Sequence, residues 1–513
     1  MPTECNAEQF EFEGFGRRRV VAAFDAGAMS SDGGGLLLRH TDRTIGLIER
    51  VAACFVDGRE QDQVVHTLPA LVGQRIVGIA LGYEDVSDHD ELRHDPVLAL
   101  LADRLEPKRS DCAPLAGKST LNRLEHTPLR RGDRYHKIGH NPAALATLFV
   151  DLFLEAHRRP PKQIVLDLDA TDDPLHGQQE GRFFHGYYSC YCYLPLYVFC
   201  GRHLLAALLR PSNIDASAGA VEEIARLVAR IRQAWPRVAI LLRADSGFAR
   251  DELMAWCEAN GIDYVFGLAR NARLIAELEA DLAAAAAAQA ETGQPARRFR
   301  EFVYATLDSW SRDRRVIGKA EHLAKGANPR FIVTSLPASA IDGRVLYERV
   351  YCARGEMENR IKEQQLDLFA DRTSAATMRA NQLRLWFASF AYVLLEALRR
   401  IRPAPYAVPG RHLRHDPTEA AQARRQGHGL GAAHQGSDRL GLPVAHRVRA
   451  RPSAARELDR PAARPRYRLN ASSRPIRQPD AAPGAPSHVR RRPELHARQC
   501  AWLVPAPHAI IHL

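Results

Sequence analysis

The 513-residue sequence predicts an α/β fold with a mixed sheet, preceded by a mostly helical N-terminal region and interrupted by a β-rich insertion. Three observations support this fold class. Apolar residues recur at helical spacing early in the chain, strand and helix patterns alternate from Lys162 onward, and a polar, strand-like stretch precedes the last helices. We therefore expect successive regions at 1–160, 161–292, 293–336, 337–402 and 403–513.

The N-terminal region, 1–160, shows helical periodicity in several places. A turn is expected at Gly33-Gly34-Gly35, and amphipathic helices are expected at 36–53, at 67–82 and in a later group that ends at His157. The pattern is typical both of a DNA-binding module and of a helical scaffold, and it does not separate the two.

The next region alternates strands with helices. Three strands, a helix, a strand, a helix and a strand follow in the order of a ribonuclease-H-like α/β fold with a mixed sheet. The strands are expected at 164–169, 193–200, 203–209, 238–242 and 263–268, and the helices at 218–235 and 251–260. Beyond them, helices are expected at 274–288, 345–369 and 378–401, with the β-rich insertion at 293–336 before the helix that completes the core.

Composition excludes several classes of protein. No signal-peptide pattern opens the chain, and the most apolar stretch, 385–395, is too short to span a bilayer. We therefore expect a soluble, cytoplasmic protein with no membrane segment. The nine cysteines form no disulfide framework, and Cys190 and Cys192 lack zinc-site spacing with His176 and His185.

The C-terminal stretch, 403–513, carries the excess of positive charge. It contains 19 arginines and 7 acidic residues, whereas the remainder has 52 basic and 53 acidic residues. One interpretation is a disordered basic tail that contacts DNA phosphates. The other is an out-of-frame translation, because 412–436, written in GC-rich codons and read one base later, can give a Leu/Lys helical repeat followed by an alternating strand. Early stop codons in the shifted frame would refute the second interpretation.

Carboxylates end two of the expected strands. The strand at 164–169 alternates, so Asp167 and Asp169 share one face. Asp245 follows the strand at 238–242, again at the carboxyl end, where α/β sheets place their sites. A turn-forming role is the plain alternative for Asp245.

A third carboxylate is expected on a helix. Tyr351, Arg354, Glu358 and Gln365 are spaced by three, four and seven residues, so they fall on one helical face. Three convergent carboxylates suit two Mg²⁺ ions, which activate an oxygen nucleophile and stabilise the leaving oxygen of a phosphodiester. Tyr351 and Arg354 are candidates to hold a phosphate, although an Arg354–Glu358 pair is also a common surface salt bridge.

These motifs resemble those of the DDE transposases of bacterial insertion sequences. The matching elements are Asp-x-Thr at Asp169, the strand-end Asp245, and Tyr-x2-Arg-x3-Glu ending at Glu358. Over roughly 15–402 the chain is similar to the insertion sequence 1380 family. The longer stretches that carry this similarity are Phe24-Asp25-Ala26-Gly27, 117–123, 167–181, 195–199, 209–211 and 357–363.

The resemblance implies a ribonuclease-H-like core that uses two Mg²⁺ ions, with Mn²⁺ as a substitute. It implies a homodimer that pairs two transposon ends at their terminal inverted repeats, hydrolytic nicking, and attack of a 3′-OH on target DNA in the bacterial nucleoid. Asp169, Asp245 and Glu358 take the three catalytic and metal-binding positions, with Asp167 as a competing ligand on the first strand.

Two further positions depart from the family's pattern or extend it. Related transposases carry a Lys seven residues after the Glu, where this chain has Gln365, and Lys362 is the candidate substitute for phosphate binding. Related enzymes also place a stacking Trp in the β-rich insertion. Trp310 is the candidate for such base stacking, with an ordinary buried Trp as the alternative.

A nucleotide cofactor is not expected. Gly117-Lys118-Ser119-Thr120 ends like a phosphate-binding loop, but that motif needs Gly where Cys112 stands. Two other functions use the same carboxylates: a ribonuclease-H-fold nuclease without strand transfer, and an inactive remnant that only binds transposon ends.

Overall fold

The computed structural model describes residues 9–12, 20–23, 30–104, 112–126, 137–401 and 510–512. The chain separates into two compact units, and the larger one, Ser30–Ala432, contains the central sheet. The smaller unit combines segments from both ends of the chain. Its described part is an antiparallel sheet of β1 (Gln9–Phe12), β2 (Val20–Ala23) and β17 (Ile510–His512). The basic tail and the motif at 24–27 otherwise lie outside the described residues.

Helices form most of the early part of the larger unit, as the periodicity predicts. The helix expected at 36–53 is two helices, because Gly46 adopts a left-handed φ of 62° and its N–H caps the Asp42 carbonyl. The elements are α1 (Gly35–Ile45), α2 (Leu47–Ala53), β3 (Phe55–Asp57), α3 (Leu68–Ala80), η1 (Val86–Asp88), α4 (His89–Leu92), α5 (Pro96–Leu101), α6 (Lys118–Glu125), β4 (Ile138–His140) and α7 (Pro142–Glu155).

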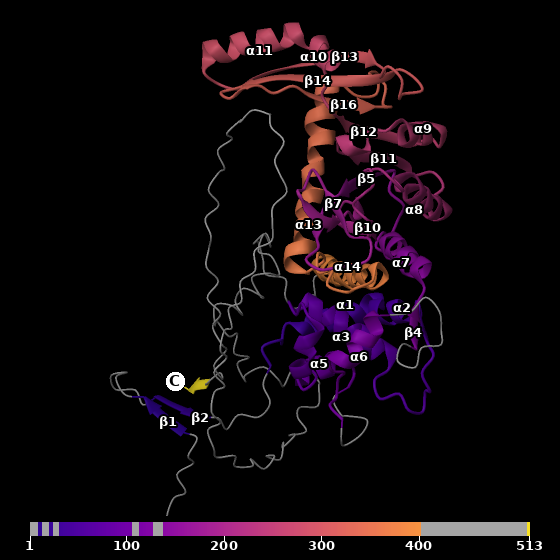
Figure 1. Ribbon diagram of the computed structural model, residues 1–513, viewed down its shortest axis with the longest axis vertical. Coiled ribbons are helices and arrows are strands. Elements are labelled where there is room, and N and C mark those ends of the chain that lie inside the picture. Colours follow the sequence, from indigo (N-terminus) through magenta and orange to yellow (C-terminus); the bar gives the residue numbers. More distant parts are fainter. Residues whose placement is uncertain are drawn as a thin grey trace, which may run out of the picture. The chain divides into compact units, whose positions relative to one another are not determined.

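A nine-stranded mixed sheet lies at the centre of this unit (Figure 1). Its order is β10-β9-β5-β11-β12-β16-β14-β13, with β15 paired to β14. β5, β11 and β12 are parallel, and their outer neighbours β9 and β16 are antiparallel to them. The strands are β5 (Gln163–Ala170), β9 (Leu196–Cys200), β10 (His203–Leu208), β11 (Ala239–Ala244), β12 (Asp263–Leu268), β13 (Ala296–Tyr304), β14 (Arg314–Leu323), β15 (Gly326–Ala327) and β16 (Arg330–Thr334).

The β-rich stretch expected at 293–336 extends this same sheet. β16 pairs with the free edge of β12, and β14 and β13 continue outward from it. A separate three-stranded sheet was not expected from the sequence. It consists of β6 (Asp173–Pro174), β7 (Phe183–His185) and β8 (Cys190–Tyr193), and it directly follows β5 in the chain.

Helices cover both faces of the central sheet. Ile164, Leu166 and Leu168 of β5 pack with α7, α8 and α9 on one face, as their alternation predicts. The other face packs against η3, with Val165 among the residues that line it. The remaining elements are α8 (Ala220–Ala234), η2 (Ser246–Phe248), α9 (Asp251–Ala259), α10 (Ala272–Glu277), α11 (Glu279–Thr292), α12 (Gly343–Val345), η3 (Leu346–Tyr351), η4 (Cys352–Arg354), α13 (Gly355–Asp367) and α14 (Met378–Ile401).

The helix expected at 345–369 is not regular. It begins with α12, continues as one π-helical segment (η3), tightens into a 3₁₀ turn (η4), and becomes α-helical only from Gly355. Such π-helical segments are uncommon and occur frequently at functional sites. Tyr351, Arg354 and Glu358 therefore lie on three differently wound segments.

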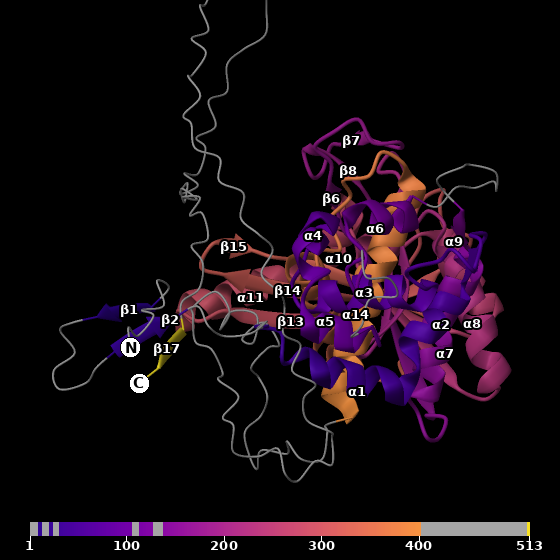
Figure 2. The same cartoon turned by 90° about the horizontal axis from the view of Figure 1, so that it is seen from below.

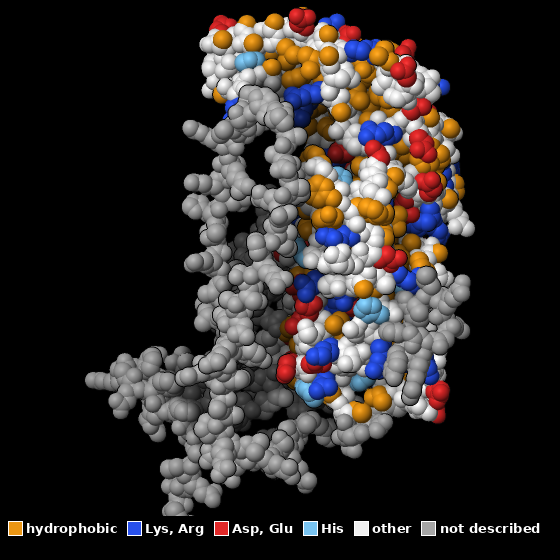
Figure 3. All heavy atoms as spheres, in the orientation of Figure 1, with side chains coloured by type: hydrophobic (Ala, Val, Ile, Leu, Met, Phe, Trp, Pro, Cys, Tyr) orange, Lys and Arg blue, Asp and Glu red, His pale blue; other side chains and the backbone are white. Residues whose placement is uncertain are grey.

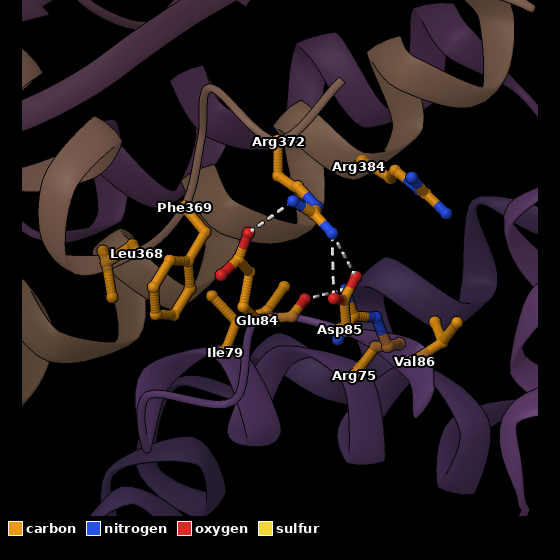
Figure 4. A pocket seen from close by; sticks show the side chains of 9 residues that line it. All are labelled: Arg75, Ile79, Glu84, Asp85, Val86, Leu368, Phe369, Arg372 and Arg384. Carbon is orange, nitrogen blue, oxygen red and sulfur yellow. Dashed lines mark hydrogen bonds and ion pairs between the residues drawn. The ribbon is translucent and has the colours of Figure 1, made fainter. Parts of the chain in front are cut away.

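The apolar helix α14 is buried, as expected for 385–395. It packs between the N-terminal helices and the β9–β10 side of the sheet, in one continuous apolar cluster. Two sets of ion pairs join the N-terminal helices to this part of the chain. Glu125 pairs with Arg75 and Arg384. Arg372 pairs with Glu84 and Asp85, as Figure 4 shows. Within the described ranges, no helix is long and apolar enough to cross a membrane.

Basic and acidic side chains are interspersed over the described surface that Figure 3 shows. This distribution agrees with the near balance of charge that the sequence has before residue 403.

Candidate active site

Asp169 is placed at the carboxyl end of β5, between β9 and β11. Its side chain is 16% exposed, and one of its oxygens accepts the Ala170 N–H at 2.9 Å. Burial raises the pKa of Asp169 to about 6; Arg354 opposes this shift, and the charges of Asp245 and Glu358 add to it. The three predicted carboxylates therefore act on one another electrostatically.

Asp245 lies at the same edge of the sheet. It follows β11, whose last residue, Ala244, is in register with Leu168 of the parallel strand β5. Its carboxylate accepts the Gly247 N–H at 2.9 Å and caps η2, so Asp245 has the turn-forming role that the sequence left open. That bond leaves further lone pairs of the carboxylate for other partners.

Gly267 on β12, which was not expected at the site from the sequence, lets the Tyr351 hydroxyl approach the turn that follows Asp245 closely. A Cβ at this position would lie 2.5 Å from the Tyr351 hydroxyl oxygen and 2.9 Å from the Ser246 nitrogen. The Tyr351 hydroxyl thus occupies the space against this turn, which only a residue without a side chain leaves open. A glycine inside a strand was the available signal.

Arg354 connects the first and third carboxylates. Its Nη1 lies 3.0 Å from Asp169 Oδ2, and its Nη2 lies 2.7 Å from Glu358 Oε1. Arg354 is 15% exposed, whereas Glu358 is 46% exposed at the rim. The predicted Arg354–Glu358 pair is therefore present, but it is one half of a bridge between two chain segments.

The competing carboxylate, Asp167, has a different environment. Arg243, in register on the neighbouring strand β11, binds it through two bonds of 2.5 and 2.8 Å, and both side chains are buried. Arg243 also donates to the Val350 carbonyl at 2.5 Å. Asp167 and Asp169 do share a face, yet Asp167 is held in an ion pair that ties β5 and β11 to η3.

Lys362 and Gln365 differ in their surroundings. Lys362 is exposed on α13, one turn beyond Glu358. Gln365 instead donates to Asp173 Oδ1 at 3.0 Å and to the Asp172 carbonyl at 3.1 Å. Asp173 is fully buried, and burial raises its pKa well above the usual range of a carboxyl. Gln365, at the position where the resemblance implies Lys, therefore bonds a buried carboxyl group whose neutral form is favoured by burial.

In the described part of the chain, the ring contacts of Trp310 are with residues other than these carboxylates. It packs partly buried against the core, edge-on to Tyr304 at 5.7 Å, with the Arg314 guanidinium 5.4 Å from its ring centre. Arg314 in turn pairs with Asp251 and Glu258 of α9. These contacts match the ordinary structural alternative for this residue and do not test base stacking.

Two other motifs of the sequence are also located. Gly117 precedes α6, and Lys118 bonds Asp90 through its backbone N–H at 3.0 Å and its ammonium at 2.9 Å. Cys190 and Cys192 are free thiols on β8. Among the described residues, no group of three or more His, Cys, Asp or Glu side chains is arranged to hold a metal ion.

The oxygen-only donor set of Asp169, Asp245 and Glu358 is of the type that Mg²⁺ and Mn²⁺ take. The guanidinium of Arg354 lies between two of these carboxylates. The donor types therefore fit a hard divalent cation, while their present arrangement is that of carboxylates neutralised by an arginine.

Comparisons with known proteins found similarity to transposases. Among solved structures, a cryo-EM structure of a piggyBac transposase synaptic complex with hairpin DNA is similar to the chain, with 13% identity and a TM-score of 0.34. The similarity covers 76% of this chain and 89% of that chain. No curated protein matches the chain. A family model described as transposase DDE domain group 1 matches residues 12–411, and the chain belongs to this transposase family.

Proposed function

We propose that this transposase moves an insertion sequence of the 1380 family by a cut-and-paste reaction. Its substrates would be double-stranded DNA with terminal inverted repeats and a target DNA, and a homodimer would pair the two ends. The observation that carries the proposal is the group formed by Asp169, Asp245 and Glu358 around Arg354, in a chain of the DDE transposase family.

The proposed core is ribonuclease-H-like. The antiparallel order β10-β9-β5 followed by the parallel strands β11 and β12 supports this fold, because it keeps the three-strand meander and two crossover helices that the sequence predicts. The β-rich stretch before η3 is then an extension of the sheet at β12, inserted before the helix that carries Glu358.

Asp169, Asp245 and Glu358 are the residues that would hold Mg²⁺ or Mn²⁺. When bound, such ions would supply activation of an oxygen nucleophile and stabilisation of the leaving oxygen. Arg354 pairs with Asp169 and Glu358, and Glu358 is the more exposed of these two carboxylates. Its 46% exposure leaves it free to change partner without disturbing the core.

The neighbouring side chains have distinct proposed tasks. Arg354 provides a planar guanidinium that can bind a phosphate through two bonds once its carboxylates have another partner. Tyr351 places its hydroxyl against the Asp245 turn, and the exposed Lys362 adds a cation on the same helix as Glu358. Asp167 serves as a positioning residue through Arg243 and Val350.

One assay tests the proposal against its alternatives. The protein is incubated with Mg²⁺, DNA that carries the inverted repeats of its element, and a target plasmid. Joined products support transposition, cleavage without joining indicates a nuclease, and binding without cleavage indicates an inactive remnant. The nucleotide sequence of the gene separately tests whether the tail at 403–513 is read out of frame.

Matched variants tie the activity to the proposed site. Glu358→Gln and Asp245→Asn should remove all products, because each exchanges a charged oxygen ligand for a neutral amide. Glu356→Gln lies two residues earlier on the same helix, is 78% exposed, and should leave activity intact. Equal activity of the Glu356 and Glu358 variants would refute the assignment.

A further inference from the structure

The segment that follows the first catalytic strand carries a concentration of exposed aromatic rings. We call residues 182–193, which include β7 and β8, the aromatic hairpin. Among the described residues, the exposed large aromatic side chains all lie within it. They are Phe183, Phe184, Tyr187 and Tyr191, with exposed fractions of 41%, 57%, 85% and 42%.

The base of the aromatic hairpin is held next to the proposed active site. β8 pairs with β6, which begins four residues after Asp169. The Tyr188 hydroxyl donates to the Ala170 carbonyl at 3.4 Å. Burial raises the pKa of the Tyr188 hydroxyl, and the charges of Asp172, Asp169 and Asp245 raise it further, so this ring lies within the field of the catalytic carboxylates. Figure 2 shows β6, β7 and β8 together at one side of the described core.

The exposed rings are arranged rather than scattered. Phe184 and Tyr191 face each other across the two strands, edge to face, with ring centres 5.5 Å apart. The Arg182 guanidinium lies 3.6 Å from the centre of the Tyr191 ring. Tyr187, at the turn, meets Tyr188 edge-on at 5.0 Å. Rings supported from behind in this way keep their geometry in water and offer flat apolar surface to a partner.

Several large apolar rings exposed within twelve residues are typical of a binding site rather than of scattered surface residues. The position of the hairpin beside Asp169 and the cation Arg182 among its rings favour DNA bases as the occupant. A strand with a phosphate at Asp169 would lie close to the base of the hairpin, because Tyr188 bonds the carbonyl of the adjacent Ala170, and Arg182 adds a cation among the rings. Bases inside a duplex cover one another's faces, so unpaired bases offer their faces to protein side chains most readily.

We propose that Phe184, Tyr187 and Tyr191 of the aromatic hairpin stack on unpaired bases of the transposon end beside the phosphate that is cut. This inference rests on the proposed function and extends it. It assigns the stacking role to the hairpin after β5, whereas the sequence suggested Trp310, whose ring is flanked by Tyr304 and Arg314.

The test uses two DNA probes that carry the inverted repeat of the element. One is fully paired, and the other has a few unpaired nucleotides at the cleavage point, with 2-aminopurine among them, whose fluorescence is quenched by stacking. The unmodified full chain should bind the unpaired probe and quench it. Phe184→Ala and Tyr191→Ala should each weaken binding of the unpaired probe by about 5- to 100-fold and abolish the quenching, while binding of the paired probe stays unchanged.

Two variants serve as controls. Leu366→Ala removes an apolar side chain that is 72% exposed on α13, and Trp310→Ala removes the ring in the β-rich extension; both should retain quenching. The proposal would be overturned if the unmodified chain did not quench the probe, or if the hairpin variants lost affinity for the paired and the unpaired probe equally. A shift from dimer to monomer in Tyr187→Ala without DNA, measured by sedimentation, would also overturn it, because the patch would then contact a second copy.

The outcome separates this inference from the proposed function. Quenching without cleavage would refute the transposase reaction and leave the stacking surface in place. Cleavage and joining by the unmodified chain, with hairpin variants that behave identically, would refute the stacking surface alone.

Discussion

Replacing Glu125 should loosen the N-terminal helices from the last helix of the core. Glu125 ends α6 and is fully buried, and its two oxygens lie 2.7 Å from Arg75 Nε on α3 and 2.7 Å from Arg384 Nε on α14. Burial alone would raise the pKa of this carboxyl, but the two guanidinium groups outweigh burial and lower it. Glu125 is therefore ionised in the folded chain and compensates two cations.

The expected magnitude follows from the burial of all three groups. Arg75 and Arg384 are only 5% and 14% exposed, so Glu125→Gln leaves two poorly hydrated cations with one shared neutral acceptor. Breaking a buried ion pair in this way costs about 3–5 kcal/mol. For a cooperative unit of this size, that loss corresponds to a melting temperature lowered by roughly 5 °C.

Thermal unfolding by circular dichroism measures the effect, and limited proteolysis shows whether the N-terminal helices are released first. The matched control is Glu356→Gln, which removes an exposed i, i+4 pair with Arg360 and should cost less than about 0.5 kcal/mol. A melting temperature of Glu125→Gln within about 1 °C of that of the control would mean that the two substitutions cost roughly the same free energy of unfolding. In that case the buried network does not hold these helices in place.

Three further predictions concern buried groups and the site. Burial lowers the pKa of His89 and His140 to about 3, so near pH 6.5 only the unfolded chain takes up protons on these histidines. The free energy of unfolding should therefore fall as the pH drops below 6.5, by up to roughly 2 kcal/mol per histidine at pH 5. His89→Gln should reduce this pH dependence in melting experiments. The raised pKa of Asp173 has the opposite sign, since stability is lost as the pH rises through it; Asp173→Asn should therefore melt higher than the unmodified chain at pH 8 and no higher at pH 4. Gly267→Ala should displace Tyr351 and lower cleavage at least tenfold while the circular dichroism spectrum is kept, and unchanged cleavage would contradict the close approach.

Much of the fold could be predicted because its longer elements repeat their apolar residues regularly. The strands β5, β11 and β12 and the helices α8, α9 and α14 lie within a few residues of their expected positions. Elements of two to four residues, such as β6 and β7, carry too few repeats to show a period. Their pairing depends on neighbours that are distant in the sequence, so tertiary contacts and not local pattern determine them.

The residues of the candidate site could be proposed from the sequence, whereas the bonds between them could not. Alternation put Asp167 and Asp169 on one face. The Asp-x-Thr motif favoured Asp169, but nothing in the local sequence indicated that the surroundings of the two carboxylates differ. The distinction comes from register: Arg243 stands opposite Asp167 on β11 and binds it, while Asp169 lies beyond the end of that pairing. The π-helical winding of η3 was equally hidden, because it changes backbone hydrogen bonds without changing the side-chain pattern.

Arg354 links two roles that the sequence treated as separate. Three carboxylates in one small region repel one another, and in this structure the Arg354 guanidinium offsets that repulsion between Asp169 and Glu358. A divalent cation bound by the same carboxylates would supply that compensation, so it would replace the arginine and not merely join it. Arg354 would then be released beside the site, with two donors ready for a phosphate. We infer that metal binding and phosphate binding are coupled through this one side chain. Arg354→Lys keeps the charge without the planar fork, so in this variant metal binding would no longer strengthen phosphate binding.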